Sequence, residues 1–270
     1  MKRHLLVVLL VLSTAFVFAQ SYKDGVYFAQ EPAFAKSGWK YQIALTVKNG
    51  KIVKADWNGV NNLGQADKKT VAASGSYGMI KVSQLKKEWH EQAAVLEDYL
   101  VKTQDVNFNK YTNKAGNTDA ISGASIMVKE FFDLAKEALA NAPVNKGPYA
   151  KDGWYFASAK DFDTGGWRSN VLITVANGTV VDAIWNGLSN DRKKKSKLVE
   201  STKGTYGMGK AAKQGEWHEQ AERVTASLVK LQKPEAVALK ADGKTDAVTG
   251  VSMAVADFYT LAADALKAAK

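Results

Sequence analysis

The sequence predicts an α+β fold of two tandem homologous domains, each a small antiparallel sheet packed with helices. Two observations lead to this prediction. The second half of the chain repeats short segments of the first half in a nearly constant register, and each copy places its strands before its helices. Strands followed by helices are typical of α+β domains, in which the sheet is antiparallel.

The repeat consists of short segments that recur 128 residues apart. Asp24-Gly25 returns as Asp152-Gly153, and Trp57-Asn58-Gly59 returns as Trp185-Asn186-Gly187. The pentapeptide Trp-His-Glu-Gln-Ala also occurs once in each copy. Each copy has the length of a small domain and exceeds a solenoid unit. The expected division is a signal peptide at 1–19, a first domain at 20–142, a linker at 143–148 and a second domain at 149–270.

The first residues are typical of an export signal. Lys2 and Arg3 precede the apolar run from Leu5 to Leu12, and Ala19 is a small residue before a cut ahead of Gln20. The run is shorter than the ~20 residues that a membrane span needs, and an uncleaved anchor is the alternative. We expect a periplasmic, cell-surface or extracellular protein, either free or associated with the membrane.

Composition excludes several classes of function. The chain has no cysteine, so disulfides, Cys-ligated metals and the lipid-bearing Cys of a lipoprotein are excluded. Its net charge is +10, and removal of Lys2 and Arg3 from the 37 basic residues leaves 35 against 27 acidic residues. A basic surface attracts nucleic acid, anionic membranes or acidic proteins. Export argues against nucleic acid, so we expect no nucleic-acid partner.

Each copy begins with a predicted β-hairpin. Apolar and polar residues alternate on both sides of Asn49-Gly50, and again around Asn177-Gly178. An Asn-Gly pair tolerates the positive φ angles of a type I′ turn. Two helices are predicted to follow. The first spans about 85–102, with apolar residues three and four apart. The second begins at or just after Ser125 and carries Met127, Phe131, Leu134 and Ala138.

A short motif precedes the closing helix in both copies. It reads Asp119-Ala120-Ile121-Ser122-Gly123-Ala124-Ser125 in the first and Asp246-Ala247-Val248-Thr249-Gly250-Val251-Ser252 in the second. Glycine lets the backbone approach a bulky group, and the start of a helix suits a phosphate, to which a hydroxyl there could be esterified. Ser, Thr and Asp before an apolar run are also ordinary helix N-caps.

The motif resembles the flavinylation motif of the FMN-binding domain family, Asp-x-x-(Ser/Thr)-Gly-Ala-(Thr/Ser). That family includes flavin-bearing subunits of ion-pumping NADH:quinone and ferredoxin oxidoreductases, and extracellular tandem-domain electron-transfer proteins. The Tyr-Gly-Met and Trp-His-Glu-Gln-Ala segments look like those of its pheromone-precursor-type lipoprotein branch, here without the lipobox Cys. The resemblance covers nearly the whole chain after the signal.

The resemblance implies covalent FMN as the cofactor. An exported flavin transferase would use FAD and Mg²⁺ to join FMN by a phosphoester to Ser125 and Ser252. A membrane dehydrogenase or a quinone-linked donor would supply electrons. The chain departs from the family in having Ser where Thr is more usual, and Val251 where Ala is usual. On this basis we expect Ser252 to be the weaker site.

The predicted cofactor-binding residues extend beyond the two serines. From the motif they are Asp119, Asp246, Ser122, Thr249, Gly123, Gly250 and Ala124. Tyr77 and Tyr206 are candidates to flank a flavin ring, as are the paired tryptophans, which would otherwise serve as core anchors. His90 and His218 would line the flavin pocket or hydrogen-bond a loop, or else have a purely structural role.

Other chemistry is poorly supported by the sequence. His90 and Glu91 are adjacent on a helix and point to different sides, and no second His follows at i+4, so we expect no metal site. No nucleophile-elbow pattern occurs, so no catalytic residue is expected. The leading hypothesis is an exported electron carrier. The alternatives are a module that binds flavin or another aromatic ligand non-covalently, and an envelope reductase, which would normally need a further domain.

Overall fold

The computed structural model describes residues 22–270, so the signal peptide predicted at 1–19 lies outside the described residues. The fold is α+β, with two three-stranded antiparallel sheets in the orders β1-β2-β3 and β4-β5-β6. The elements of the first domain are β1 Gly25–Gln30, β2 Trp39–Lys48, β3 Lys51–Asn61, α1 Lys68–Ala73, α2 Trp89–Thr103 and α3 Lys129–Ala140, with a 3₁₀ turn η1 at Met79–Lys81. Those of the second are β4 Gly153–Ser158, β5 Trp167–Ala176, β6 Thr179–Ser189, α4 Lys197–Thr202, α5 Trp217–Leu231 and α6 Ala256–Leu266, with 3₁₀ turns η2 Met208–Lys210, η3 Pro234–Ala236 and η4 Lys267–Ala269.

The predicted hairpins are confirmed in both domains. Asn49 and Gly50 have φ angles of 53° and 73°, and Asn177 and Gly178 have 50° and 69°, as a type I′ turn requires. The carboxylate of Asp152 accepts a hydrogen bond from the Gly178 amide at 2.7 Å, and Asp24 does the same for Gly50 at 3.1 Å. The repeated Asp-Gly and Asn-Gly segments therefore hold each hairpin turn against the first strand.

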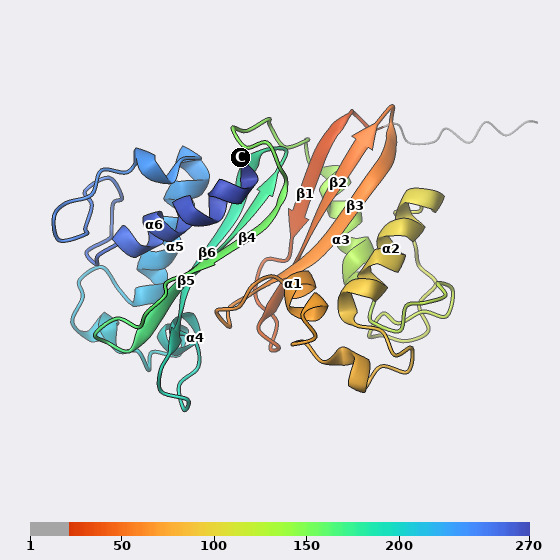
Figure 1. The fold of residues 1–270 in the computed structure, drawn as a ribbon. Helices are drawn as coiled ribbons and strands as arrows, with labels where there is room; N and C mark the ends of the chain where they lie inside the picture. Colours follow the sequence, from red (N-terminus) through yellow and green to blue (C-terminus); the bar gives the residue numbers. More distant parts are fainter. Residues whose placement is uncertain (1–21) are drawn as a thin grey trace, which may run out of the picture.

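The two domains form four layers, helices–sheet–sheet–helices (Figure 1). Helices α2 and α3 cover one face of the first sheet, and α5 and α6 cover the corresponding face of the second. Each domain has its own hydrophobic core between sheet and helices. The outward faces of the sheets meet, where Val60, Leu172 and Ile184 form a small third cluster.

Gln42 is the polar centre of the contact between the sheets. It is fully buried, and its amide nitrogen donates to Gln30 and to Asp182, at 2.8 and 2.6 Å. Its oxygen accepts from the Trp154 indole at 2.7 Å and the Thr174 hydroxyl at 2.8 Å. All the hydrogen-bonding capacity of its carboxamide is thus used, largely by the other domain.

The closing helices begin later than the sequence suggested. α3 starts at Lys129 and α6 at Ala256, four residues after Ser125 and Ser252, and their N-cap residues Val128 and Val255 make no side-chain cap. The prediction of a helix starting at the serine was wrong, and so was its N-cap alternative. Met127, expected on the apolar stripe, is 46% exposed and precedes the helix.

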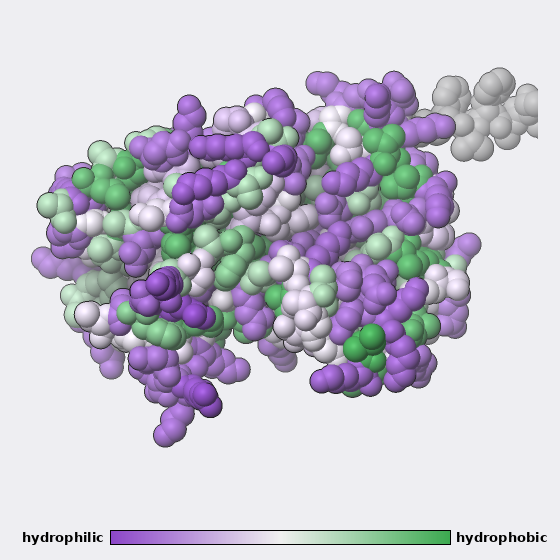
Figure 2. All heavy atoms as spheres, viewed as in Figure 1, coloured by the Kyte–Doolittle hydropathy of each residue, from purple (hydrophilic) through white to green (hydrophobic). Residues whose placement is uncertain are grey.

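The surface seen in Figure 2 is mostly hydrophilic, with hydrophobic side chains in separate patches. Within residues 22–270, no helix has the length and apolar character needed to cross a membrane.

Candidate functional site

Each domain contains a cluster of aromatic rings around one lysine. The first aromatic cluster comprises Trp39, Tyr41, Trp57, Tyr77 and Trp89 around Lys68. The second aromatic cluster comprises Trp167, Trp185, Tyr206 and Trp217 around Lys197. The six tryptophans are all buried, as the core-anchor interpretation expected.

The repeated Trp-Asn-Gly segment explains why a lysine lies inside each cluster. The Trp forms one side of the cluster. The Asn side-chain oxygen accepts a hydrogen bond from a backbone N–H in the first turn of the next short helix: Asn58 from Lys69 at 2.9 Å, and Asn186 from Leu198 at 2.9 Å. The Gly leaves room for the lysine, because a Cβ on Gly59 would lie 3.2 Å from the Lys68 side chain. The lysine is thereby directed into the rings.

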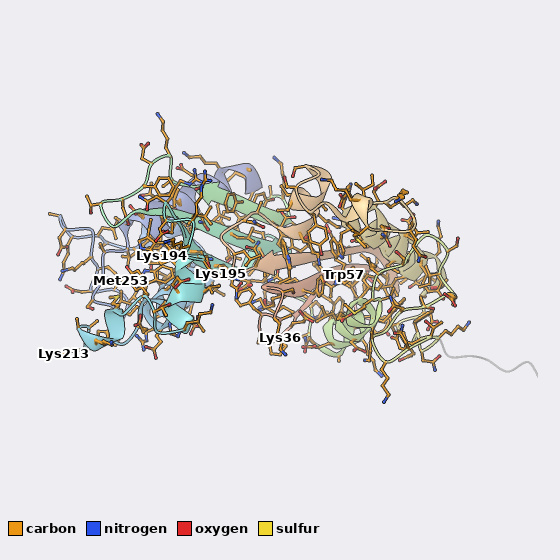
Figure 3. The ribbon with its side chains drawn as sticks, turned by 90° about the horizontal axis from the view of Figure 1, so that it is seen from below. Lys36, Trp57, Lys194, Lys195, Lys213 and Met253 are labelled. Carbon is orange, nitrogen blue, oxygen red and sulfur yellow. The ribbon has the colours of Figure 1, made fainter. Side chains whose placement is uncertain are left out.

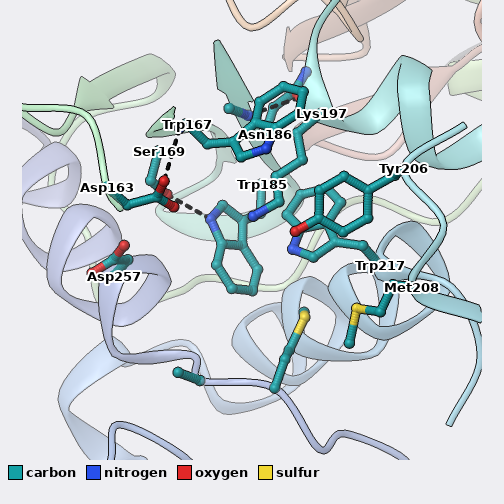
Figure 4. A pocket seen from close by; sticks show the side chains of 13 residues that line it. Asp163, Trp167, Ser169, Trp185, Asn186, Lys197, Tyr206, Met208, Trp217 and Asp257 are labelled. Carbon is teal, nitrogen blue, oxygen red and sulfur yellow. Dashed lines mark hydrogen bonds between the residues drawn. The ribbon is translucent and has the colours of Figure 1, made fainter. Parts of the chain in front are cut away.

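The second aromatic cluster encloses a cavity of about 290 Å³ (Figure 4). This volume is near the lower end of the ~300–1,000 Å³ typical of ligand pockets. Besides the aromatic residues, the cavity is lined by polar side chains and two methionines. They are Asp163, Ser169, Asn186, Lys197, Asp257, Met208 and Met253.

Of the lysines that the structure describes, only Lys197 lines this cavity. Its Nζ lies 5.0 Å from the centroid of the Trp217 ring and 5.1 Å from that of Tyr206, within the range of cation–π attraction. Burial lowers the pKa of Lys197, and the carboxylates of Asp163 and Asp257 oppose that shift. The cavity thus offers flat aromatic walls, one cationic donor and two carboxylate acceptors.

The predicted acceptor serines are exposed, and Ser252 comes directly before a segment that lines this cavity. The next residue, Met253, lines the cavity, and so does Ala254. Figure 3 shows Met253 and Trp57 in separate halves of the molecule, one in each domain. The aromatic cluster and the predicted acceptor are therefore neighbours within the second domain.

A fully buried glutamine holds each serine in place. The oxygen of Gln92 accepts from the Ser125 backbone N–H at 2.7 Å and from its hydroxyl at 3.1 Å. Gln220 accepts from the same groups of Ser252 at 2.8 and 3.4 Å. Neither glutamine is among the residues predicted from the sequence, although both belong to the repeated Trp-His-Glu-Gln-Ala segment.

The glycine of each motif adopts a backbone conformation that other residues rarely take. Gly123 and Gly250 have φ angles of 92° and 76°. A Cβ on Gly250 would lie 3.3 Å from Nε of Arg223, whose guanidinium donates to the Gly250 carbonyl at 2.8 Å. In the first domain, the Lys87 ammonium has a similar place, 3.9 Å from a Cβ built on Gly123. A basic side chain therefore accompanies each serine motif.

The remaining predicted residues divide into two groups. Tyr77 and Tyr206 belong to the aromatic clusters. Asp119, Asp246, Ser122 and Thr249 are exposed on the loop, and Ala124 is buried in the first core. None of these five lines the second-domain cavity. The Asp246 carboxylate accepts from the Lys240 ammonium at 2.6 Å.

The histidines do not face the aromatic cavity. His218 lines a second, larger cavity of about 790 Å³ at the domain boundary, and its Nδ1 is hydrogen-bonded to the Ser201 hydroxyl at 2.9 Å. His90 has a buried Nδ1 without a hydrogen-bond partner. His218 is not among the residues that line the cavity containing Tyr206, because the face of α5 that bears this histidine turns towards α4.

Comparison with known proteins gave few relatives. No protein-family model matches the chain, and no curated protein matches it. The solution NMR structure of a Clostridium thermocellum protein is 49% identical, with a TM-score of 0.36, over 46% of this chain and 95% of that one. The crystal structure of a Clostridium perfringens protein is 21% identical, with a TM-score of 0.33, over 44% of this chain and 88% of that one. Neither name states an activity or a ligand.

Proposed function

We propose that this chain is an exported electron-transfer flavoprotein with FMN joined by a phosphoester to a serine in each domain. The observation that carries the proposal is the position of Ser252. Ser252 is exposed, lies two residues after Gly250 with its positive φ angle, and directly precedes two residues that line an aromatic cavity. A flavin attached there would have a stacking surface within reach of its tether.

The residues of the second domain fit FMN by their chemistry. Indole and phenol rings stack on a planar ring system. Lys197 can donate to its carbonyl oxygens, and Asp163 can accept from a ring N–H. Arg223, which donates to the Gly250 carbonyl at 2.8 Å, would pair with a phosphate on Ser252, since Arg pairs well with phosphate oxygens. Bound FMN would supply the redox chemistry, and the protein its position and electrostatic environment.

Attachment requires a second protein. The Ser252 hydroxyl would attack the flavin-side phosphorus of FAD, forming the Oγ–P bond as the phosphoanhydride breaks and AMP leaves. Gln220 orients the hydroxyl, but a carboxamide cannot remove its proton. The base and the Mg²⁺ ion would therefore come from the flavin transferase. An exposed serine suits such a partner.

The electron donor proposed for this chain is a membrane dehydrogenase or a quinone-linked carrier, with the acceptor further outward. The experiment is co-expression with a flavin transferase, followed by denaturing electrophoresis and intact mass. We expect a fluorescent band and a mass gain of one FMN for each modified serine. Ser125→Ala and Ser252→Ala should each remove one FMN. A band without fluorescence, at the unmodified mass, would contradict the proposal.

A non-covalent module for flavin or another aromatic ligand is the second candidate. It is favoured by the cavity itself, since the rings and Lys197 form a binding surface that does not include the serine hydroxyl. In that case the ligand would be released on denaturation and Ser252→Ala would retain it.

A further inference from the structure

The two domains differ at one position of their aromatic clusters. Tyr41 and Ser169 occupy the same place in their sheets, each paired with the glycine of the Trp-Asn-Gly segment: Tyr41 with Gly59, Ser169 with Gly187. Ser169 lines the cavity of the second domain. The first domain has a large aromatic side chain at the position where the second has a hydroxymethyl group.

The Tyr41 ring lies against the aromatic surfaces that a ligand would use. Its centroid is 4.9 Å from that of Trp57, and it stacks on Trp89 at 5.9 Å with planes 16° apart. Its hydroxyl accepts a hydrogen bond from Lys68 Nζ at 2.6 Å. Tyr41 thus makes the two interactions, stacking and acceptance from the lysine, that the second domain offers to a planar ligand with a polar edge.

The tryptophans next to Ser169 and Tyr41 differ in the hydrogen bonding of their indole N–H groups. In the second domain, Trp185 Nε1 donates to the Ser169 hydroxyl at 2.8 Å. In the first, the equivalent Trp57 Nε1 is buried and has no hydrogen-bond partner among residues 22–270. A buried donor without a partner is costly, so Tyr41 occupies this place at the expense of a hydrogen bond that a serine would satisfy.

The two lysines differ in their exposure. Lys68 is only 3% exposed, whereas Lys197 is more accessible and lines an open cavity. Two carboxylates act on each lysine, Glu31 and Glu130 on Lys68 and Asp163 and Asp257 on Lys197, and the second pair lines the cavity of the second domain. The second cluster therefore presents both a cation and a carboxylate to a ligand, and the first encloses its cation.

We infer that the two halves of the duplication are not equivalent sites. The second domain binds a planar aromatic ring with donor and acceptor groups on one edge, of the isoalloxazine class, and Tyr41 closes the corresponding place in the first. The identity of the ring rests on the proposed function. From the sequence, Ser252 was expected to be the weaker site; by this inference the second domain, which carries Ser252, holds its flavin ring better than the first. A flavin on Ser125 would keep its ring in solvent.

The test uses the full chain with one acceptor at a time. Ser125→Ala leaves flavin on the second domain only, and Ser252→Ala on the first only. We expect iodide to quench the fluorescence of the first-domain flavin several-fold more strongly. Adding Tyr41→Ser should shield that flavin, and adding Ser169→Tyr should expose the second-domain flavin. Tyr41→Phe is the matched control, since it keeps the ring and should leave the first-domain flavin accessible.

Equal quenching of the two flavins, or no effect of Ser169→Tyr in a folded protein, would overturn the inference. A second measurement does not depend on flavinylation. Unmodified protein is titrated with lumiflavin, with thermal melts to confirm folding. We expect one equivalent bound by the wild type, none by Ser169→Tyr and two by Tyr41→Ser. If neither serine carries FMN, the proposed function fails, and this stoichiometry alone decides whether the domains differ.

Discussion

Replacement of Gln92 by leucine tests whether this residue positions the predicted acceptor. The side chain is fully buried and accepts from the Ser125 N–H and O–H, at 2.7 and 3.1 Å. Its amide nitrogen donates to the buried Ser83 hydroxyl at 3.3 Å and the Lys87 carbonyl at 3.4 Å. Leucine has a similar size but supplies none of these bonds.

The stability cost follows from which partners can turn to water. Ser125 is exposed, so its two groups can hydrate, but Ser83 is left buried without its donor. A net hydrogen bond is worth about 0.5–1.5 kcal/mol and an unsatisfied buried group costs about 1–3 kcal/mol. We expect Gln92→Leu to lose about 2 kcal/mol in unfolding free energy, and its Tm to fall by about 4–8 °C if the domains unfold together.

The assay combines thermal melting with FMN occupancy after co-expression with a flavin transferase. Gln92→Leu should lose the FMN of Ser125 and keep that of Ser252, and Gln220→Leu should show the reverse. Gln104→Leu is the control, because Gln104 lies at the other end of α2 and bonds both backbone groups of Ile52, at 2.8 and 2.9 Å. It should cost stability but not occupancy. Full modification of Ser125 in Gln92→Leu, or an equal loss in Gln104→Leu, would refute the positioning role.

Three further predictions concern stability. Burial lowers the pKa of Lys68 from 10.5 to about 8, so between these pH values the unfolded chain binds more protons than the folded chain. The free energy of unfolding should therefore rise by about 3 kcal/mol from pH 8 to pH 10.5. Urea unfolding of Lys68→Met should lack this rise, and equal pH profiles of variant and wild type would contradict the prediction. Gln42→Leu removes the acceptor of the Trp154 indole and of the buried Thr174 hydroxyl at the domain interface, which should cost about 3 kcal/mol or more and split the calorimetric transition into two. One unchanged transition would show that Gln42 does not couple the domains. Gly178→Ala would place a Cβ 2.2 Å from the Tyr149 carbonyl oxygen. Gly204→Ala is the control, because Gly204 has a similar φ angle but a Cβ there would have no atom within 4 Å. The Tm of Gly178→Ala should therefore be well below that of Gly204→Ala, and similar Tm values would exclude the clash.

Local patterns were enough to predict the hairpin in each sheet, but not the first strands, β1 and β4. Alternation around Asn49-Gly50 and Asn177-Gly178 predicts the strands and the turn, because an Asn-Gly turn fixes the residues that pair next to it. In both sheets the register then shifts after two pairs, at Thr46/Val47 and at Thr174/Val175, and the pattern did not predict this. The stripe containing Trp89 and Leu96 placed α2 to within a few residues. These features depend on neighbours close in sequence, which is why the pattern sufficed.

The contacts that build the site join residues distant in sequence. Lys68 and Lys69 look alike in a basic run, yet Lys68 enters the aromatic cluster and Lys69 pairs with Asp56 and Glu97, at 2.6 and 2.7 Å. Only the position of α1 against β3 separates them. The start of the closing helix was missed for a similar reason: the amide of Ser125 bonds the side chain of Gln92 rather than continuing a helix.

The contact between the sheets has a consequence for how the two copies pair. Lys40 bonds Asp182 across the interface at 3.0 Å, with both side chains largely shielded from solvent. The residue of the first domain aligned with Asp182 is Lys54. Two first domains meeting through this face would set lysine against lysine, and two second domains would lack the tryptophan-binding Gln42, which is Asn170 in that copy. Covalent linkage allowed the two faces to diverge into complementary ones, so the duplication specifies pairing within one chain and disfavours association between like halves of different chains.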